Sequence, residues 1–421
     1  MVREMKDSGI EWIGKIPASW TLRRLQWCLI EVAEKNDPIK TTQILSLTNK
    51  QGVLPYEDKG AQGNKAKENL AEYKLAYEDT LIVNSMNVII GSVGISHYFG
   101  CVSPVYYVFK ETNESDLRFI NYIFNTVGFQ KECRKFAKGI LEIRLRISTS
   151  DLFKRPIPLP NIEKQRKIAD YLDKECAEID AILEKTHNSI EEYKKLKQAI
   201  ITQAVTKGVR GDRPMKESGI EWVPMIPADW DIIPSKRLFA DSDERKRPDD
   251  ELLTASQKYG VISQQQYMER EKARVVLATQ GIENWKHVEP YDFIISLRSF
   301  QGGLEMSEVS GCITWHYIVL KPLRPIHSFY FKWLFKSKLY IKALQRTCNF
   351  IRDGQDLRYS NFVQVPLFIP PMEEQKEIAD ALNIRCAEID ALIQKKVHFI
   401  SELESYKKSL IYEYVTGKKE I

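Results

Sequence analysis

The hydrophobic pattern of this chain contains two long segments with helical periodicity, one near its middle and one at its end. Residues 162–205 hold neither proline nor glycine, and their apolar positions recur every three or four residues. Pro158 and Pro160 precede this segment and Gly208 follows it, which is the usual punctuation of helix ends. Residues 373–415 repeat the arrangement. The pattern predicts two amphipathic helices, each about 65 Å long.

Each predicted helix has one apolar face and a charged remainder. Two such helices are most simply buried against each other, and the distance between them in the sequence permits an antiparallel coiled coil. The spacing alone does not separate a pair that only joins domains from a pair that also docks partner subunits. We expect coiled-coil or subunit contacts from these apolar positions: Ile179, Leu183, Tyr193, Leu196, Ile389, Ile393, Leu403 and Leu410.

The segments before the two helices are typical of a mixed α/β (α+β) fold with many short strands. Residues 79–83 and 292–296 are short apolar runs, which predict buried strands. Residues 119–124 and 329–335 are aromatic stretches of helical character, and we expect their rings to lie in the core. The chain therefore consists of two globular parts, each followed by a long helix.

The chain repeats itself at an offset of 210 residues. Segments 5–20 and 215–230 are identical at 11 of 16 positions and share the pattern Gly-Ile-Glu-Trp followed by Ile-Pro-x-x-Trp. A second block, with Glu-x-Gln, Ile-Ala-Asp and Cys-Ala-Glu-Ile-Asp-Ala, recurs in segments 163–181 and 373–391. Between these blocks the two copies match only in scattered places. Such a repeat predicts two copies of one architecture that recognise two different things.

Composition narrows the class of protein only slightly. The 421 residues include 62 basic and 57 acidic side chains, so a polyanion would have to be bound by local patches. Seven cysteines without a Cys-x-x-Cys pair favour free thiols in a reducing compartment, and we expect Cys101, Cys176, Cys312 and Cys386 to be buried. We find no secretory signal and no run of 18 apolar residues, so we expect a cytoplasmic protein without a membrane partner.

Motifs for catalysis are missing from the sequence. There is no phosphate-binding Gly-x-x-x-x-Gly-Lys loop, no dinucleotide fingerprint, and no Asn/Asp-Pro-Pro-aromatic tetrad of an adenine methyltransferase. The spacing of Glu57 and Lys59 resembles part of a nuclease site but lacks the preceding Pro-Asp. The histidines form no metal-ligand pair at helical spacing. We therefore expect a non-catalytic protein.

Polar and basic residues recur at equivalent places in the two globular parts. Each predicted buried strand leads into a loop with serine, amide or arginine side chains and glycines that permit close approach of a backbone. Arginine and glutamine are suited to guanine and adenine edges, although any single arginine is as often solvated or paired with an acid. The candidate DNA-binding residues are Asn84, Ser85, Asn87, Ser92, Arg144, Arg146, Ser296, Arg298, Ser299, Gln301, Arg352 and Arg358.

The repeated blocks, together with Ser-Leu-Arg-Ser-Phe-Gln-Gly-Gly-Leu-Glu at 296–305 and Ile-Ser-Thr-Ser-Asp-Leu at 147–152, resemble the specificity subunit of type I restriction-modification enzymes over essentially the whole chain. The resemblance implies target recognition domains at 1–158 and 211–368, each reading one half of a bipartite, asymmetric site in double-stranded DNA. It implies helical spacer regions at 159–210 and 369–421 that form the antiparallel coiled coil and set the gap.

The same resemblance implies partners that carry the chemistry. Two methyltransferase subunits would dock on the helices, and restriction subunits with the motor and nuclease would join them in a holoenzyme that methylates adenine or cleaves DNA. S-adenosylmethionine, ATP and Mg²⁺ would be bound by these partners and not by this chain. Two alternatives stay open: a DNA-binding protein that acts without a methyltransferase, and a protein-binding scaffold, whose affinity would depend less on salt.

Overall fold

The computed structural model describes most of the chain, namely residues 3–48, 51–59, 69–139, 145–272, 281–297, 299–347 and 357–421. Its contacts divide the chain into two compact units that are not contiguous in sequence. Unit 1 comprises Met1–Thr186 and Val397–Ile421, and unit 2 comprises His187–Lys396. Each unit therefore combines one globular part with portions of both long helices.

Unit 1 is built around an antiparallel four-stranded sheet in the order β4-β11-β8-β9. Its central strand β8 (Thr80–Asn84) is buried along its whole length. The other sheet strands are β4 (Leu29–Glu31), β9 (Val93–Ser96) and β11 (Tyr106–Glu111). Paired two-stranded sheets surround it: β1 (Met5–Asp7) with β2 (Lys15–Pro17), β3 (Thr21–Arg24) with β12 (Pro156–Leu159), β5 (Leu45–Thr48) with β6 (Gly52–Pro55), and β7 (Lys74–Ala76) with β10 (Gly100–Val102).

The helices of unit 1 pack aromatic side chains into the core that they share with the sheet. In α1 (Leu117–Phe124), Phe119, Ile120 and Phe124 are buried in the main core, as the aromatic pattern predicted. Asp116 caps this helix, because its carboxylate accepts the N–H groups of the first turn. The remaining short helices are α2 (Val127–Phe136), α3 (Thr149–Phe153), η1 (Leu25–Trp27), η2 (Tyr56–Lys59), η3 (Leu70–Glu72) and η4 (Val88–Ile90).

Unit 2 repeats this topology with the sheet order β16-β23-β20-β21. Its strands are β16 (Phe239–Ser242), β20 (Phe293–Ile295), β21 (Glu305–Met306) and β23 (Ile318–Pro322). The two-stranded pairs are β13 (Met215–Ile220) with β14 (Val223–Pro227), β15 (Asp231–Ile233) with β24 (Leu367–Ile369), β17 (Leu253–Ser256) with β18 (Gly260–Ser263), and β19 (Lys286–Val288) with β22 (Gly311–Ile313). The mixed α/β class is thereby confirmed in both globular parts.

The helices of unit 2 follow the same order as those of unit 1. The aromatic helix α7 (Ser328–Lys336) buries Tyr330, Phe331 and Phe335 against the sheet. The others are α5 (Gln264–Glu271), α6 (Ser299–Gly302), α8 (Lys338–Arg346), α9 (Tyr359–Phe362), η6 (Ser235–Arg237) and η7 (Ile282–Asn284). Cys101, Cys312, Cys176 and Cys386 are buried in their matching positions, as predicted.

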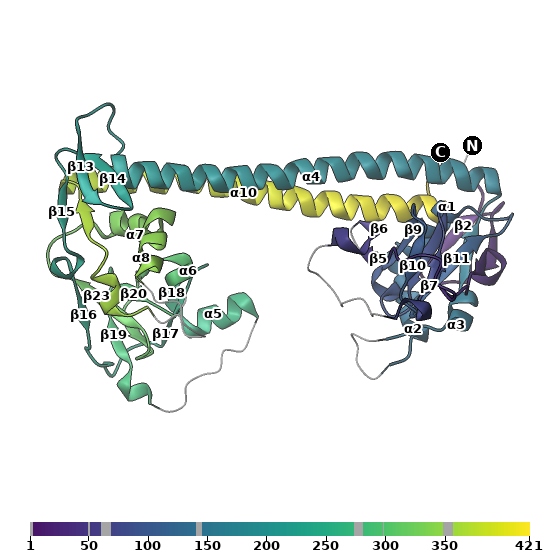
Figure 1. Cartoon of the computed structure of the whole chain (residues 1–421), viewed down its shortest axis with the longest axis horizontal. Coiled ribbons are helices and arrows are strands. Elements are labelled where there is room, and N and C mark those ends of the chain that lie inside the picture. The colour runs from purple at the N-terminus through teal and green to yellow at the C-terminus, as the bar shows by residue number, and fades with distance from the viewer. Residues whose placement is uncertain are drawn as a thin grey trace. The chain divides into compact units, whose positions relative to one another are not determined.

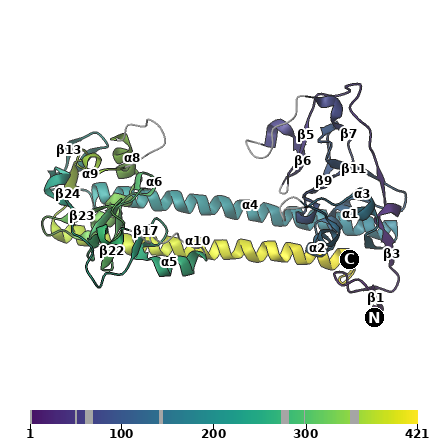
Figure 2. The same ribbon diagram turned by 90° about the horizontal axis from the view of Figure 1, so that it is seen from below.

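The two long helices are α4 (Ile162–Lys207) and α10 (Met372–Val415), within two residues of the predicted bounds (Figures 1 and 2). Within each unit they run antiparallel, as their cross-helix contacts show. In unit 1, Tyr171 packs on Tyr414 and Asp180 contacts Lys407 at 2.5 Å. In unit 2, Lys197 contacts Asp390 at 2.6 Å, and Arg210, just after α4, contacts Glu377 at 2.8 Å. Within the described part of the chain, no helix combines the length and the apolar character needed to cross a bilayer.

Most of the predicted contact residues lie in the seam between the helices. Ile179, Ile389 and Leu410 are buried, and Leu183 and Leu403 are half-buried against the core of unit 1. Ile393 and Tyr193 are half-buried, and Lys396 lies over the Tyr193 ring at 5.7 Å. Leu196 differs, because 48% of its surface is exposed. It therefore lies outside the seam, and a contact with a partner subunit stays a prediction for this residue.

Each long helix ends in a left-handed glycine that packs on the tryptophan of a repeated Ile-Pro motif. Gly417 (φ 69°) lies so close to Pro17 and Trp20 that a Cβ there would approach the proline Cδ to 2.6 Å. Gly208 (φ 78°) takes the equivalent place beside Trp230. At both positions only glycine fits the backbone conformation and the available space. Through these contacts the end of α10 packs into unit 1, and the end of α4 packs into unit 2.

The start of each long helix is fastened by the glutamine of the repeated Glu-x-Gln motif. The Gln165 amide donates to the carbonyl oxygens of Pro160 and Glu114, both at 2.9 Å, and accepts from the Asp116 N–H. Gln375 donates to Pro370 O at 2.9 Å and accepts from the His327 N–H at 2.9 Å. Both amides are buried and satisfied, which explains why this motif occurs twice.

Glu374 tests the contact between the start of α10 and the repeated Ile-Pro motif in unit 2. Its fully buried carboxylate accepts from Trp230 Nε1 at 3.0 Å and pairs with Arg213. Replacing Glu374 with alanine leaves the indole N–H without its acceptor and opens a cavity. We expect Glu374→Ala to lower the free energy of unfolding by about 2–4 kcal/mol in urea denaturation. Glu377→Ala is the matched control, since Glu377 pairs with Arg210 on the surface, and an equal loss in both variants would contradict this role.

Candidate nucleic-acid interface

In unit 1, the predicted DNA-binding loop follows the central strand β8. The Ser85 side chain is buried, and its hydroxyl donates to Val105 O at 2.7 Å, which fastens the loop to the start of β11. The Asn84 side chain is also buried and accepts from the Met86 N–H at 3.1 Å. These two side chains shape the loop, and a contact with DNA stays a prediction for both.

The second half of this loop turns through η4. Asn87 precedes η4, is half-buried, and its carbonyl oxygen accepts from the Ser92 N–H at 3.0 Å. The Ser92 side chain is buried. Gly91 closes the turn with φ 81°, and a Cβ there would meet Gln130 at 2.8 Å. Of Asn87 and Ser92, Asn87 therefore has the more accessible side chain. Ile90, in the same turn, is 55% exposed.

The fold brings Arg146 to the same loop from about sixty residues away. The N–H of the neighbouring Ile147 donates to Ser85 O at 3.1 Å. Arg146 itself pairs through its backbone with Lys138, with both N–H···O distances at 2.8 Å, and both basic side chains are exposed. Lys138 was not among the predicted residues, since only the strand pairing places it beside Arg146. Two cations beside a polar loop suit phosphate contact.

In unit 2, the equivalent loop is held by a pair of serines. The Ser296 N–H donates to Ser299 Oγ at 2.8 Å, and the Ser299 N–H donates to Ser296 O at 3.0 Å. Both side chains are buried, so their hydroxyl groups support the turn. Gln301 lies in α6 with its side chain exposed, and its contact with a base edge stays a prediction. Gly303 has φ 79°, and a Cβ there would clash with Phe335 O.

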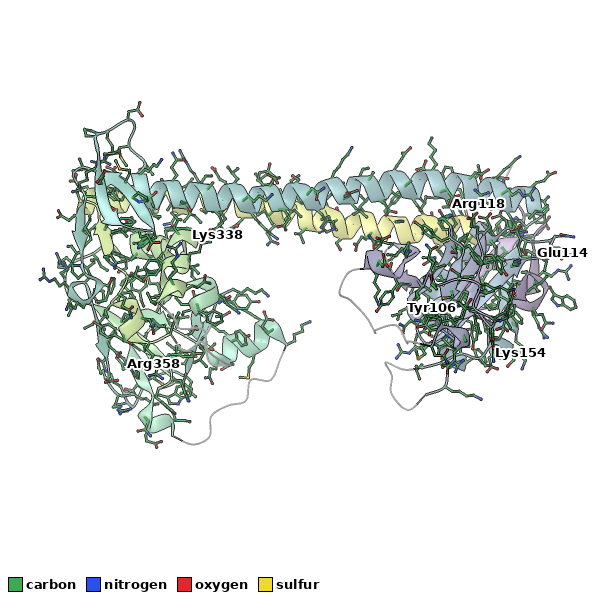
Figure 3. All side chains as sticks on the ribbon, in the orientation of Figure 1. Tyr106, Glu114, Arg118, Lys154, Lys338 and Arg358 are labelled. Carbon is green, nitrogen blue, oxygen red and sulfur yellow. The ribbon has the colours of Figure 1, made fainter. Side chains whose placement is uncertain are left out.

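Arg358 lies at the end of the globular part of unit 2, immediately before α9. Its side chain is exposed (Figure 3). Its backbone N–H donates to Asn361 Oδ1 at 3.0 Å. No hydrogen bond joins Arg358 to Gln301 among the residues that the structure describes. Arg144, Arg298 and Arg352 lie outside the described residues, so their roles stay predictions. The exposed candidates are therefore Arg146 in unit 1, and Gln301 and Arg358 in unit 2.

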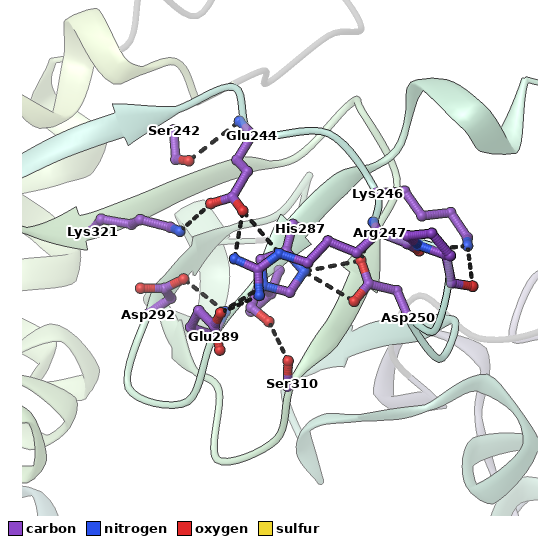
Figure 4. Close-up of polar contacts among 12 residues, drawn as sticks. Ser242, Glu244, Lys246, Arg247, Asp250, His287, Glu289, Asp292, Ser310 and Lys321 are labelled. Carbon is purple, nitrogen blue, oxygen red and sulfur yellow. Dashed lines mark hydrogen bonds and ion pairs between the residues drawn. The ribbon is translucent and has the colours of Figure 1, made fainter.

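The basic stretch 245–247 of unit 2 makes contacts within the chain. Arg245 Nη1 donates to Asn284 O at 2.7 Å, and Lys246 Nζ donates to Arg247 O at 2.9 Å. Arg247 pairs with Glu244 at 2.6 Å and with Glu289 at 2.7 Å (Figure 4). These side chains therefore have partners within the chain, as is usual for a charge cluster with neighbouring acids. Among the described residues, no group of histidine, cysteine and acidic side chains has the arrangement of a metal site.

A buried histidine lies at the centre of this polar network. His287 is 1% exposed, and both ring nitrogens face carboxylates: Nδ1 lies 2.9 Å from Asp250, and Nε2 lies 2.9 Å from Glu289 (Figure 4). An imidazole between two acceptors is satisfied only when both nitrogens carry protons. The network joins residues from positions 244 to 321 and lies at the start of β20, whereas the Ser296 loop leaves the end of that strand. Sequence spacing gave no signal of it.

The titration of these groups follows from their contacts. Burial disfavours protonated His287, but hydrogen bonds to Asp250 and Glu289 outweigh it and raise the pKa of the imidazole. Burial also raises the pKa of Asp292 to about 6. Hydrogen bonds from Lys321 and Arg247 lower the pKa of Glu244 to about 2. The network is therefore most favourable with a charged His287 and an ionised Glu244.

Comparisons with known proteins identify the family. The family model described as the type I restriction modification DNA specificity domain matches residues 27–192 and 227–398. A relative from Methanocaldococcus jannaschii, named as the specificity subunit of the type I restriction enzyme MjaX, is 24% identical over 426 residues and aligns over 96% of this chain and 95% of its own length. The chain belongs to the type I restriction-modification specificity family and carries two DNA specificity domains.

Two solved structures show the same fold. One chain comes from work on complex assembly and conformational transition of the type I R-M system, and it has a TM-score of 0.67 at 14% identity, covering 95% of this chain and 98% of its own length. The other is the HsdS subunit from Thermoanaerobacter tengcongensis, with a TM-score of 0.52 at 14% identity, covering 96% of this chain and 98% of its own length. At this identity they bear on the fold alone.

The His287 network predicts a pH dependence of stability in unit 2. A raised histidine pKa contributes stability that is fully present below the unfolded pKa, about 6.5, and is lost as pH rises through the folded value. Asp292 acts in the same direction at lower pH, because its contribution is lost between its unfolded pKa of about 4 and its folded pKa of about 6. We expect the melting temperature of the protein to fall between pH 6 and pH 8.5, and His287→Gln to reduce this slope. His398→Gln, an exposed control, should keep the slope; an unchanged slope in His287→Gln would contradict the prediction.

Proposed function

We propose that this chain is the DNA-recognition subunit of a type I restriction-modification complex, in which each globular part reads one half of a bipartite, asymmetric site. The observation that carries this proposal is a contrast between two sets of residues: those that join each globular part to the long helices, and those in the loops after the central strands. The glycines, glutamines and tryptophans that join domain to helix occur in both copies, whereas the loops after β8 and β20 differ in almost every side chain. One architecture with two unlike loops suits two unlike half-sites.

The surface of the helix pair supports docking of two copies of one partner. Unit 1 exposes Ile182 and Tyr406, and unit 2 exposes Leu392 and Leu196, each between 41% and 50% of its surface. These four residues are equivalent in the 210-residue repeat: Ile182 corresponds to Leu392, and Leu196 corresponds to Tyr406. The ion pairs beside them, Asp180 with Lys407 and Asp390 with Lys197, match in the same way. A repeated apolar surface favours identical partners.

In this proposal the two partners are methyltransferase subunits, and restriction subunits join the same assembly. S-adenosylmethionine, ATP and Mg²⁺ act on those partners, and this chain contributes recognition without catalysis in the cytoplasm. The antiparallel helices set the gap between the half-sites, because a fixed spacer makes half-site separation a geometric quantity. The alternatives of a DNA-binding protein without a methyltransferase and of a protein-binding scaffold are less favoured, since the family match covers both globular parts.

The proposal is tested by mapping methylation. We expect co-expression of this chain with a cognate methyltransferase, in a host free of adenine methylation, to produce one split, asymmetric motif that is modified once on each strand. Long-read sequencing that detects modified adenines measures it. Exchanging residues 231–368 for the corresponding part of a relative should change one half of the motif and keep the other. A stable complex without any methylated motif would contradict the proposal.

The docking surface has its own test. We expect Ile182→Glu combined with Tyr406→Glu to remove one of two bound methyltransferase subunits, because charges on an apolar contact oppose burial. Native mass spectrometry of the purified complex measures the stoichiometry. The control is Phe399→Ser, which gives an exposed position on α10 the residue of its counterpart Ser189. Retention of both partners by the double variant would contradict this surface.

A further inference from the structure

The most distinctive exposed aromatic group in unit 2 lies on the turn between β22 and β23. The Trp315 side chain is 54% exposed, and its ring stacks on the ring of His316 with a centroid distance of 3.6 Å and an interplanar angle of 26°. His316 Nδ1 lies 3.1 Å from Thr314 Oγ1. The Tyr317 N–H donates to Thr314 O at 3.0 Å, which closes the turn. The indole is thus held on the surface by stacking and is not folded back onto the core.

This turn is adjacent to the loop that follows β20. Strands β20 and β23 pair antiparallel with Ile295 opposite Ile318, so the chain leaving β20 and the chain entering β23 meet at one corner of the sheet. Leu297 follows β20 by two residues and is 49% exposed. Trp315 and Leu297 therefore place two large apolar side chains at the corner from which the Gln301 loop departs. Adjacent exposed apolar groups mark a contact site more reliably than isolated ones.

Unit 1 has the same turn without the apolar pair. Its Tyr106 N–H donates to Ser103 O at 2.9 Å, as in unit 2. Pro104 occupies the position of Trp315, and Ser85 occupies the position of Leu297. There the Ser85 hydroxyl donates to Val105 O and closes the corner. The backbone of the corner is thus shared between the units, but its exposed chemistry is not.

This asymmetry indicates which partner the corner contacts. A methyltransferase that docks twice needs a surface present in both units, as the helix pairs provide. A corner whose backbone is shared and whose side chains differ instead suits a ligand that differs between the units, which is the DNA half-site. We propose that Trp315, with Leu297, makes an apolar contact with a base in the half-site read by unit 2, so that Trp315 determines specificity there. This inference rests on the proposed function.

Aromatic and aliphatic side chains contact bases in two ways. They pack on the thymine methyl group in the major groove, or they stack on the face of a base that has left its neighbour. Both contacts are apolar, and both require a ring presented away from the protein, as the stacked Trp315–His316 pair presents it. The Trp315 indole has the flat surface for either contact.

The test uses the complex of the full chain with its methyltransferase and the site defined by methylation mapping. Methylation rates are measured on duplexes with single base-pair changes in each half-site. We expect Trp315→Ala to lower the rate on the cognate site by about 10- to 100-fold and to flatten discrimination at one or two base pairs of the unit 2 half-site. Discrimination in the other half-site should be unchanged. Trp315→Phe should retain most of the activity.

Trp27→Ala is the matched control, because Trp27 is 58% exposed and belongs to unit 1, whereas Trp315 belongs to unit 2. Uracil in place of thymine should lower the wild-type rate but not the Trp315→Ala rate if the methyl group is contacted. A 2-aminopurine probe should brighten only with the wild-type chain if a base is unstacked. Unchanged discrimination in Trp315→Ala, an equal loss in both half-sites, or no response to either probe would overturn the inference. Absence of any bipartite methylation by the wild-type complex would instead contradict the proposed function.

Discussion

The antiparallel packing of α4 against α10 is the interaction on which each domain depends. In unit 1, the core contains Ile168 and Leu172 from the start of α4 together with Leu410 and Val415 from the end of α10. In unit 2, residues from the end of α4 and the start of α10 take these places. Neither globular part therefore completes its core with residues that are local in sequence. The helix pair belongs to both cores as an integral part.

This dependence explains which residues the two copies share. The helix ends require glycine in a left-handed conformation against a tryptophan, and the helix starts require a buried glutamine that satisfies backbone groups. A change at any of these places would weaken the domain in which it lies. The loops after β8 and β20 face no such requirement beyond closing their turns. The fold thus separates the residues that hold a domain together from those that can vary with its target.

The sequence predicted the helices, the repeat and the buried strands because each depends on local periodicity. The sequence placed Leu196 among the helix contacts. The apolar stripe of each long helix is wider than the contact between the two helices, so Ile182, Leu196 and Leu392 remain exposed. At the candidate interface, the buried Ser85 and Ser299 were grouped with Gln301 and Arg146, since sequence does not reveal which hydroxyl groups satisfy a turn. The His287 network and the Trp315 corner arise from strand pairing between distant residues, which no local pattern reports.

In the proposed arrangement one helical spacer joins two domains that read unlike half-sites, so a change in the length of the spacer should change the gap alone. A heptad inserted at matching positions of both helices adds about 10 Å, or about three base pairs, while keeping the seam in register. Methylation mapping of this variant should show both half-sites unchanged and the gap between them longer. An unchanged gap, or a change in the bases recognised, would contradict the account.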